Sequence, residues 1–336
     1  MIDNYLNLFI DNDYPNFIDK YLNTKTLNRI KNVTYFCGCD YTKLYSPLFL
    51  YTRFDHSLVV AHMTWHFTHD KIQTIAALLH DVGTPCFAHC IDYVFGDYIN
   101  QESSEKEIID VIKYDKELMS YLNEDGITLN NLTKLEKFPI LENSSPQLCT
   151  DRLDGVLSTC YIWLHTHSLD QIKNVYDNLI VLTNEYGNPE LGFKNQDIAD
   201  CFVSMVAVYA KELQKNEDKY VMKYVSEIVK LAVAQKLITL NDLYEKQEKD
   251  IVNIFANNFS SWNLFASATT VTRTEAKPTG FYISFCAKKR NTIPLVNSSN
   301  HINRIDKVSK KAKRIYSELE NYQDTKFAYV KTLKRL

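Results

Sequence analysis

The chain has 336 residues, of which 45% are hydrophobic and 24% are charged, and this composition excludes disordered and fibrous proteins. Its formal net charge is −3, and with only 8 Gly and 8 Pro it contains few helix breakers, which indicates a mainly helical fold. It has neither a secretory signal nor an apolar run of about 18 residues that could span a membrane, so we expect a cytoplasmic protein without a membrane partner.

The clearest helix signals lie between residues 50 and 100. Thr52 and Asp55 form a T-x-x-D capping box before the apolar run "HSLVVAHMTWHF", which predicts a helix. A second helix is predicted over 70–83, with an aspartate as its N-cap and a glycine to end it. The Thr-Pro pair at 84–85 predicts the N-cap and first residue of a third helix, which would extend through Phe95.

Later in the chain, polar segments alternate with segments of helical periodicity. Residues 122–147 are polar and are expected to be irregular. Helices are predicted near 149–164, 196–214 and 217–236, within 239–257, and in the amphipathic segment 307–322. The aromatic and β-branched residues of 279–296 are typical of strands. We therefore predict a mainly α protein, with a helical domain over 1–258 (motif core 50–165) and a smaller α+β lobe over 259–336.

The C-terminal segment is strongly basic. Residues 259–336 contain 15 Lys and Arg against 5 Asp and Glu. Such a surface could meet nucleic acid, but solvated helix faces are the commoner explanation, so a nucleic-acid partner is not favoured.

Four ionisable side chains in apolar surroundings suggest a metal site. His80 and Asp81 follow one predicted helix, His56 lies on the helix before it, and Asp151 opens a much later one. Taken singly, each has a simpler explanation, such as a helix cap or a satisfied core histidine. Together, two imidazoles and two carboxylates suit one divalent cation, and a cation would offset the cost of burying their charge.

The motifs "RFDHS" at 53–57, "LLHDVG" at 78–83 and "TDRLD" at 150–154 resemble the HD superfamily of metal-dependent phosphohydrolases. Within it, the chain is similar to the deoxynucleoside triphosphate triphosphohydrolase branch, from about residue 25 to 325. The resemblance implies an HD-domain helical bundle with His56, His80, Asp81 and Asp151 as metal ligands. The family's metal is Mn, Fe, Mg, Zn or Co, and the sequence does not decide among them.

Three further residues match the pattern of that family. His89 and Asp92 stand at i and i+3 of the predicted third helix, where the carboxylate could orient the imidazole. The resemblance implies that His89 acts on the phosphate as an acid or electrostatic stabiliser and that Asp92 holds it. It also implies that Arg53 binds a substrate phosphate, for which a guanidinium group is well shaped.

Four positions depart from the family pattern. Thr84 and Gln101 stand where the family commonly has histidines, although both could still hydrogen-bond a phosphate. Gly155 and Thr159 stand where it often has a tyrosine and an aspartate that contact the sugar and phosphates. The wall that reads the nucleotide is therefore expected to differ.

These observations predict an enzyme that uses a metal-activated water to attack phosphorus in a nucleotide, with a (deoxy)nucleoside triphosphate favoured. One alternative is hydrolysis of a phosphodiester or nucleoside monophosphate at the same metal. A second alternative is a nucleotide-binding sensor with little turnover. The resemblance also favours a homo-oligomer.

Overall fold

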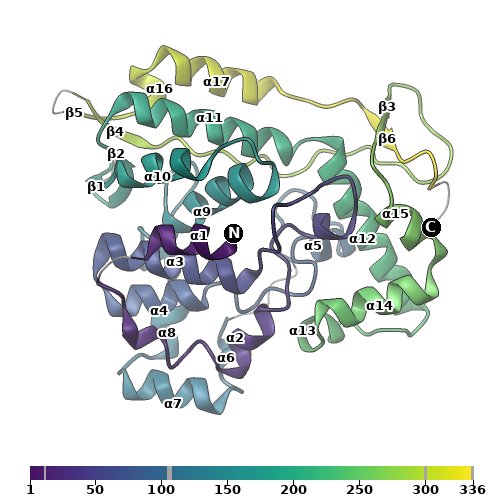
Figure 1. The fold of residues 1–336 in the computed structure, drawn as a ribbon, viewed down its shortest axis with the longest axis horizontal. Coiled ribbons are helices and arrows are strands. Elements are labelled where there is room, and N and C mark those ends of the chain that lie inside the picture. Colours follow the sequence, from purple (N-terminus) through teal and green to yellow (C-terminus); the bar gives the residue numbers. More distant parts are fainter. Residues whose placement is uncertain (11–12, 104–107, 299–300, 334–336) are drawn as a thin grey trace.

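The computed structural model describes residues 1–336 except 11–12, 104–107, 299–300 and 334–336. Helices make up most of the molecule, and two small sheets lie apart from each other, the four-stranded sheet at upper left and the two-stranded sheet at upper right (Figure 1). This arrangement confirms the predicted mainly α fold with a smaller α+β part. In the part of the chain described, no helix is both long and apolar enough to cross a membrane.

The N-terminal half consists of helices linked by turns. In chain order they are α1 (Ile2–Leu6), α2 (Lys25–Ile30), α3 (Arg53–Thr68), α4 (Lys71–Leu79), α5 (Cys90–Val94), α6 (Ile108–Ile112), α7 (Lys116–Glu124), α8 (Leu129–Thr133), α9 (Thr150–Ser158) and α10 (Leu169–Asp177). A π-helical turn, Thr159–Trp163, continues α9. Short helices interrupt the segment that was expected to be irregular.

Helix α3 contributes side chains to both hydrophobic cores of the fold. Its N-terminus has the predicted capping box, in which the Thr52 amide donates to Asp55 Oδ2 over 2.9 Å and the Asp55 amide donates to Thr52 Oγ1 over 3.2 Å. Val59 on α3 belongs to the larger hydrophobic core, whereas Val60 belongs to a smaller core shared with α4. Because both sides of α3 are buried, its side chains are held with little freedom.

The C-terminal half adds long helices and the strands. They are β1 (Leu179–Thr183), β2 (Pro189–Phe193), α11 (Gln196–Glu212), α12 (Asn216–Ala234), α13 (Asp242–Glu245), α14 (Glu248–Asn258), α15 (Ser260–Ala266), β3 (Thr272–Thr274), β4 (Leu295–Ser298), β5 (His301–Arg304), α16 (Ile305–Val308), α17 (Lys310–Asn321) and β6 (Phe327–Tyr329). Of the segment expected to form strands, only its end does so, in β4. Residues 284–294 before it are extended without a strand partner in the described chain.

The main sheet has the strand order β1-β2-β4-β5 and joins residues from both sides of position 258. Strand β4 pairs parallel to β2, where Gly192 faces Leu295. A Cβ atom on Gly192 would lie 2.8 Å from the Leu295 carbonyl oxygen, so this close approach requires glycine. The buried Glu190 on β2 also pairs with Arg304 on β5, with Oε2 2.8 Å from Nη2. The C-terminal residues are thus built into the fold, and the domain boundary at 258 stays a prediction.

The predicted third helix is wrong over its first half. Residues 86–89 form turns, and α5 begins only at Cys90. Phe87 and Ala88 have positive φ angles of 63° and 46°, which a right-handed helix cannot contain. Thr84 is accordingly no N-cap; its hydroxyl donates to Asp81 Oδ1 over 3.3 Å. Contacts with the distant helix α14 override the local Thr-Pro signal.

The buried carboxylate of Glu248, on α14, holds this turn segment in place. It accepts hydrogen bonds from the Phe87 amide over 2.7 Å, from Thr34 Oγ1 over 2.7 Å and from the Tyr41 hydroxyl over 2.6 Å. Burial raises the pKa of Glu248. These bonds hold three separate segments to α14, and His89 lies two residues after Phe87 in one of those segments.

We expect Glu248→Ala to lower the free energy of unfolding by about 2–4 kcal/mol, because it leaves several buried donors without an acceptor. Urea denaturation followed by circular dichroism measures this change. The exposed Glu245, replaced by alanine in the same region, is the control and should stay within about 0.5 kcal/mol of the wild type. Equal stability of the two variants would contradict the anchoring role.

Candidate metal centre and its cavity

Three side chains singled out in the sequence, those of His56, His80 and Asp151, converge on one point, and the fourth, Asp81, lies beside them. Asp151 Oδ1, on α9, lies 3.1 Å from His56 Nε2 and 3.5 Å from His80 Nε2. Asp81 Oδ2 lies 3.8 Å from His56 Nε2 and 3.9 Å from His80 Nε2. Donor atoms of His56, His80 and Asp151 all lie within 4.8 Å of one another, so this group could hold a metal ion.

The two imidazoles are oriented as metal ligands require. His80 Nδ1 lies 2.6 Å from the Ala77 carbonyl oxygen, which only accepts, so Nδ1 carries the proton and Nε2 keeps a lone pair. Among the described residues, this buried Nε2 has no hydrogen-bond partner. An unsatisfied buried nitrogen is costly, and a cation would satisfy it. The residues therefore fit a divalent metal.

Asp154 fixes the orientation of His56. Its Oδ2 lies 2.6 Å from His56 Nδ1, and the fully buried carboxylate also accepts from the hydroxyls of Tyr5 over 2.7 Å and Tyr51 over 3.0 Å. A carboxylate behind a ligating histidine fixes the tautomer and strengthens the ligand. Sequence reasoning gave Asp154 no role. Its spacing, three residues after Asp151 on the same helix face, is the signal that could have found it.

The electrostatic environment of the candidate metal centre favours positive charge. Burial alone would lower the pKa of His56, but hydrogen bonds to Asp151 and Asp154 raise it to about 9. Burial alone would raise the pKa of Asp81, but the neighbouring Arg53 and the two histidines hold it well below its usual range. Both shifts come from carboxylates and cations packed together, which is the environment a metal ion would enter.

Arg53 contacts a candidate ligand directly. Its Nη1 donates to Asp81 Oδ2 over 2.9 Å, and its guanidinium lies 4.7 Å from the centre of the Tyr35 ring. Tyr35 in turn packs against His56, with 4.5 Å between ring centres. Arg53 therefore orients Asp81 as well as lining the cavity, and its expected contact with a substrate phosphate stays a prediction.

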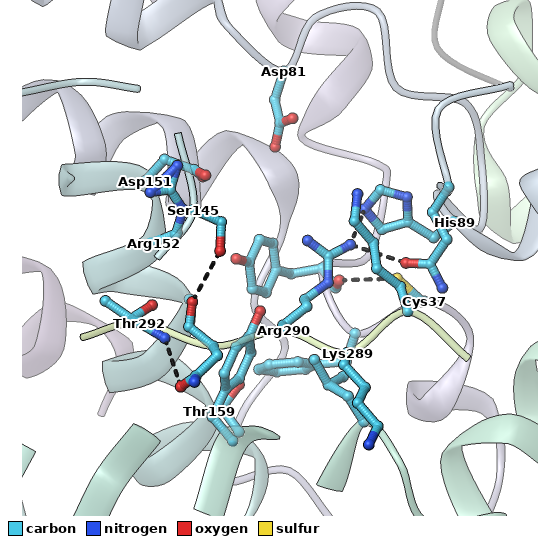
Figure 2. Close-up of a pocket in the computed structure, with 18 of the residues that line it drawn as sticks. Cys37, Asp81, His89, Ser145, Asp151, Arg152, Thr159, Lys289, Arg290 and Thr292 are labelled. Atoms are coloured by element: carbon cyan, nitrogen blue, oxygen red, sulfur yellow. Dashed lines mark hydrogen bonds between the residues drawn. The ribbon is translucent and has the colours of Figure 1, made fainter. Parts of the chain in front are cut away.

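A second polar cluster lies on the other side of the cavity. His89 Nδ1 is 3.0 Å from Asp92 Oδ2, so the expected contact is present although the helix before it is not. Burial lowers the pKa of His89, and Asp92 opposes that shift. Gln101 Oε1 accepts from Arg290 over 2.9 Å. Figure 2 shows Arg290 beside His89, between that cluster and the side chains of Asp81 and Asp151.

The two clusters share a cavity of about 560 Å³. Of the positions that depart from the family pattern, Gln101, Gly155 and Thr159 line it, whereas the buried Thr84 is absent from its described lining. Space beside Gly155 is occupied by hydroxyl groups from elsewhere: a Cβ atom there would lie 3.4 Å from the Tyr35 oxygen and 3.9 Å from the Tyr209 oxygen. Two tyrosines from distant segments thus form the wall at this position.

Comparison with known proteins gives a fold but no family. No protein-family model matches the chain. The uncharacterised protein YdhJ of Bacillus subtilis is 28% identical over 208 residues, which cover 60% of this chain and 60% of YdhJ, less than two thirds of that relative. A hypothetical protein from Aquifex aeolicus has a TM-score of 0.61 at 14% identity, covering 93% of this chain and 92% of its own.

A phosphohydrolase from Bacteroides thetaiotaomicron also has a TM-score of 0.61, at 12% identity and with 97% of each chain covered. The chain shares the fold of this phosphohydrolase. At such low identity the likeness concerns the fold alone, so the roles of individual residues rest on the geometry described above.

Proposed function

We propose that the chain is a metal-dependent phosphohydrolase that acts on a nucleotide, with a ribo- or deoxyribonucleoside triphosphate as the favoured substrate. The observation that carries the proposal is the convergence of two imidazole Nε2 atoms and the Asp151 carboxylate, with the Asp81 carboxylate beside them, next to a cavity that arginines also line. The fold shared with a phosphohydrolase and the motif resemblance support it. We expect the protein to act as a homo-oligomer in the cytoplasm.

His56, His80, Asp81 and Asp151 would hold the metal. When bound, a divalent ion at such a site lowers the pKa of a coordinated water and polarises a phosphoryl oxygen. Asp154 fixes the tautomer of His56, and the Ala77 carbonyl fixes that of His80. These bonds keep both Nε2 atoms directed at one point.

The remaining residues would handle the phosphate. His89, oriented by Asp92, can place its Nε2 toward the leaving oxygen, and in its protonated form it can donate a hydrogen bond or the proton there. Arg53, fixed by Asp81, can neutralise charge on the attacked phosphate. Gln101 lines the same side of the cavity and can donate to a phosphate oxygen through its amide. Thr84 is kept here as a weaker candidate, since its hydroxyl is bonded to Asp81.

The test is a panel of substrates and metals. Protein stripped of metal is reconstituted with Mn, Fe(II), Mg, Zn or Co and is incubated with nucleoside tri-, di- and monophosphates and cyclic dinucleotides. Chromatography identifies the products. We expect hydrolysis of nucleoside triphosphates that is lost with a chelator and restored by at least one metal. Turnover of monophosphates or phosphodiesters instead would favour the alternative substrate class. Tight nucleotide binding without turnover under any metal would favour a sensor and sink the enzyme proposal.

A further inference from the structure

The segment 288–292 crosses the edge of the cavity in a fixed position, although it has no regular secondary structure. The Lys288 amide donates to the Tyr98 carbonyl over 3.1 Å, and Gln214 Nε2 donates to the Lys288 carbonyl over 2.8 Å. At the other end, the Tyr316 hydroxyl donates to the Thr292 carbonyl over 2.7 Å. Because both ends are tied to other parts of the chain, the side chain between them is placed reproducibly.

Arg290 enters the cavity from this segment. Its Nη2 donates to Gln101 Oε1 over 2.9 Å and lies 3.4 Å from His89 Nε2. The neighbouring Lys289 points away and donates to the Glu320 carbonyl over 2.8 Å (Figure 2). Both residues line the cavity, but Arg290 bonds to the candidate catalytic cluster, whereas the exposed Lys289 bonds to the Glu320 carbonyl and to no member of that cluster in the described chain.

Arg290 differs from Arg53 and Arg152, which also line the cavity, in its lack of a paired carboxylate among the described residues. Arg53 pairs with Asp81 over 2.9 Å, and Arg152 pairs with Glu142 over 2.8 Å. Within the described residues, no carboxylate lies within 4.0 Å of the Arg290 guanidinium, whose recorded bonds go to a neutral amide and an imidazole. Arg290 is partly buried, and a cation in such a position without a counterion is costly, so an anion in the cavity would lower that cost.

We propose that Arg290 binds a phosphate group of the substrate other than the one attacked at the metal, so that the site selects compounds with two or more linked phosphates. This inference rests on the proposed function and specifies its substrate class. Arg53 serves the phosphate beside the metal ligands, and Arg290 serves the next one on the His89 side. A guanidinium binds two phosphate oxygens at once, which a neutral amide at this position could not do.

Binding of inorganic polyphosphates tests the proposal without catalysis. Metal-stripped, desalted protein is titrated calorimetrically with tripolyphosphate and with orthophosphate at low ionic strength. We expect Arg290→Gln to weaken tripolyphosphate binding by about 10- to 100-fold, the effect of losing hydrogen bonds to a charged group, and to change orthophosphate binding by less than about threefold. Arg290→Lys keeps the charge without the planar fork and should fall between Arg290→Gln and the wild type.

Lys289→Gln is the matched control, because it removes the same charge one residue away, from an exposed side chain at the cavity edge that bonds to the Glu320 carbonyl and not to His89 or Gln101. It should bind tripolyphosphate within about threefold of the wild type. The proposal would be overturned if Arg290→Gln weakened the binding of tripolyphosphate and orthophosphate to the same extent. It would also be overturned if Arg290→Gln and Lys289→Gln weakened tripolyphosphate binding equally. Thermal unfolding of each variant verifies that it is folded. If Arg290→Gln does not fold, the binding data of Arg290→Lys are used in its place. A wild-type preference of Arg290→Lys for tripolyphosphate over orthophosphate would then contradict a role for the planar guanidinium.

Failure of this inference and failure of the proposed function give different results. Absence of turnover with every metal removes the proposed function, whereas the titration still shows whether Arg290 selects polyphosphates. Turnover of triphosphates with an unchanged KM in Arg290→Gln leaves the function in place and removes the role of Arg290. The two measurements are therefore independent.

Discussion

Asp151→Asn is expected to abolish metal binding and hydrolysis together. Asp151 Oδ1 is the atom nearest to both imidazole Nε2 atoms, and an amide of the same shape supplies a neutral, weaker ligand. Residues that only orient a metal ligand typically contribute about 10- to 100-fold in affinity or activity, so loss of a ligand should lower kcat/KM by more than about 100-fold. A one-metal site predicts about one ion per chain in the wild type. Elemental analysis of the purified variant should find only a small fraction of that content.

The control for Asp151→Asn is the same change at Asp170, an exposed residue in the first turn of α10. Asp170→Asn should keep both metal and activity. If Asp151→Asn retained a full complement of metal and the wild-type rate, the ligand set would be wrong and the convergence of these side chains would be only structural.

Asp154→Asn has the second largest expected effect, since Asp154 acts through His56. An asparagine offers one acceptor where the carboxylate accepts from His56, Tyr5 and Tyr51, so at least one buried group loses its partner. We expect metal affinity to fall by about 10- to 100-fold and the free energy of unfolding to fall by about 1–3 kcal/mol. Competition with a chromophoric chelator measures the affinity, and urea denaturation measures the stability.

Tyr51→Phe separates the two effects, because it removes one donor from the same carboxylate but leaves the contact with His56. It should cost about 1 kcal/mol of stability and leave metal affinity within about threefold of the wild type. Should Tyr51→Phe weaken metal binding as much as Asp154→Asn, the effect of Asp154 would be general destabilisation and not orientation of His56.

The local sequence determined the helical character of the chain and the start of helix α3. The capping box at Thr52 and Asp55 appears as predicted, because both partners lie within one turn and need no distant contact. The same signal type failed at Thr84 and Pro85, where Glu248, on a helix more than 160 residues later, binds the Phe87 amide and holds a turn instead. A local preference of this kind is weak, and several buried hydrogen bonds outweigh it.

The sequence also indicated the residues that meet at the candidate metal centre, because ionisable groups in apolar segments need a partner and the resemblance to the HD motifs implied which ones share it. It could not show how His56 and His80 are oriented, since the acceptors that set their tautomers, Asp154 and the Ala77 carbonyl, are defined only by packing. Arg290 is the clearest case: it is distant in sequence from every motif, and only the folded chain brings it to His89 and Gln101. Composition and periodicity act over a few residues, whereas the shape and charge of the cavity arise from segments far apart in the chain.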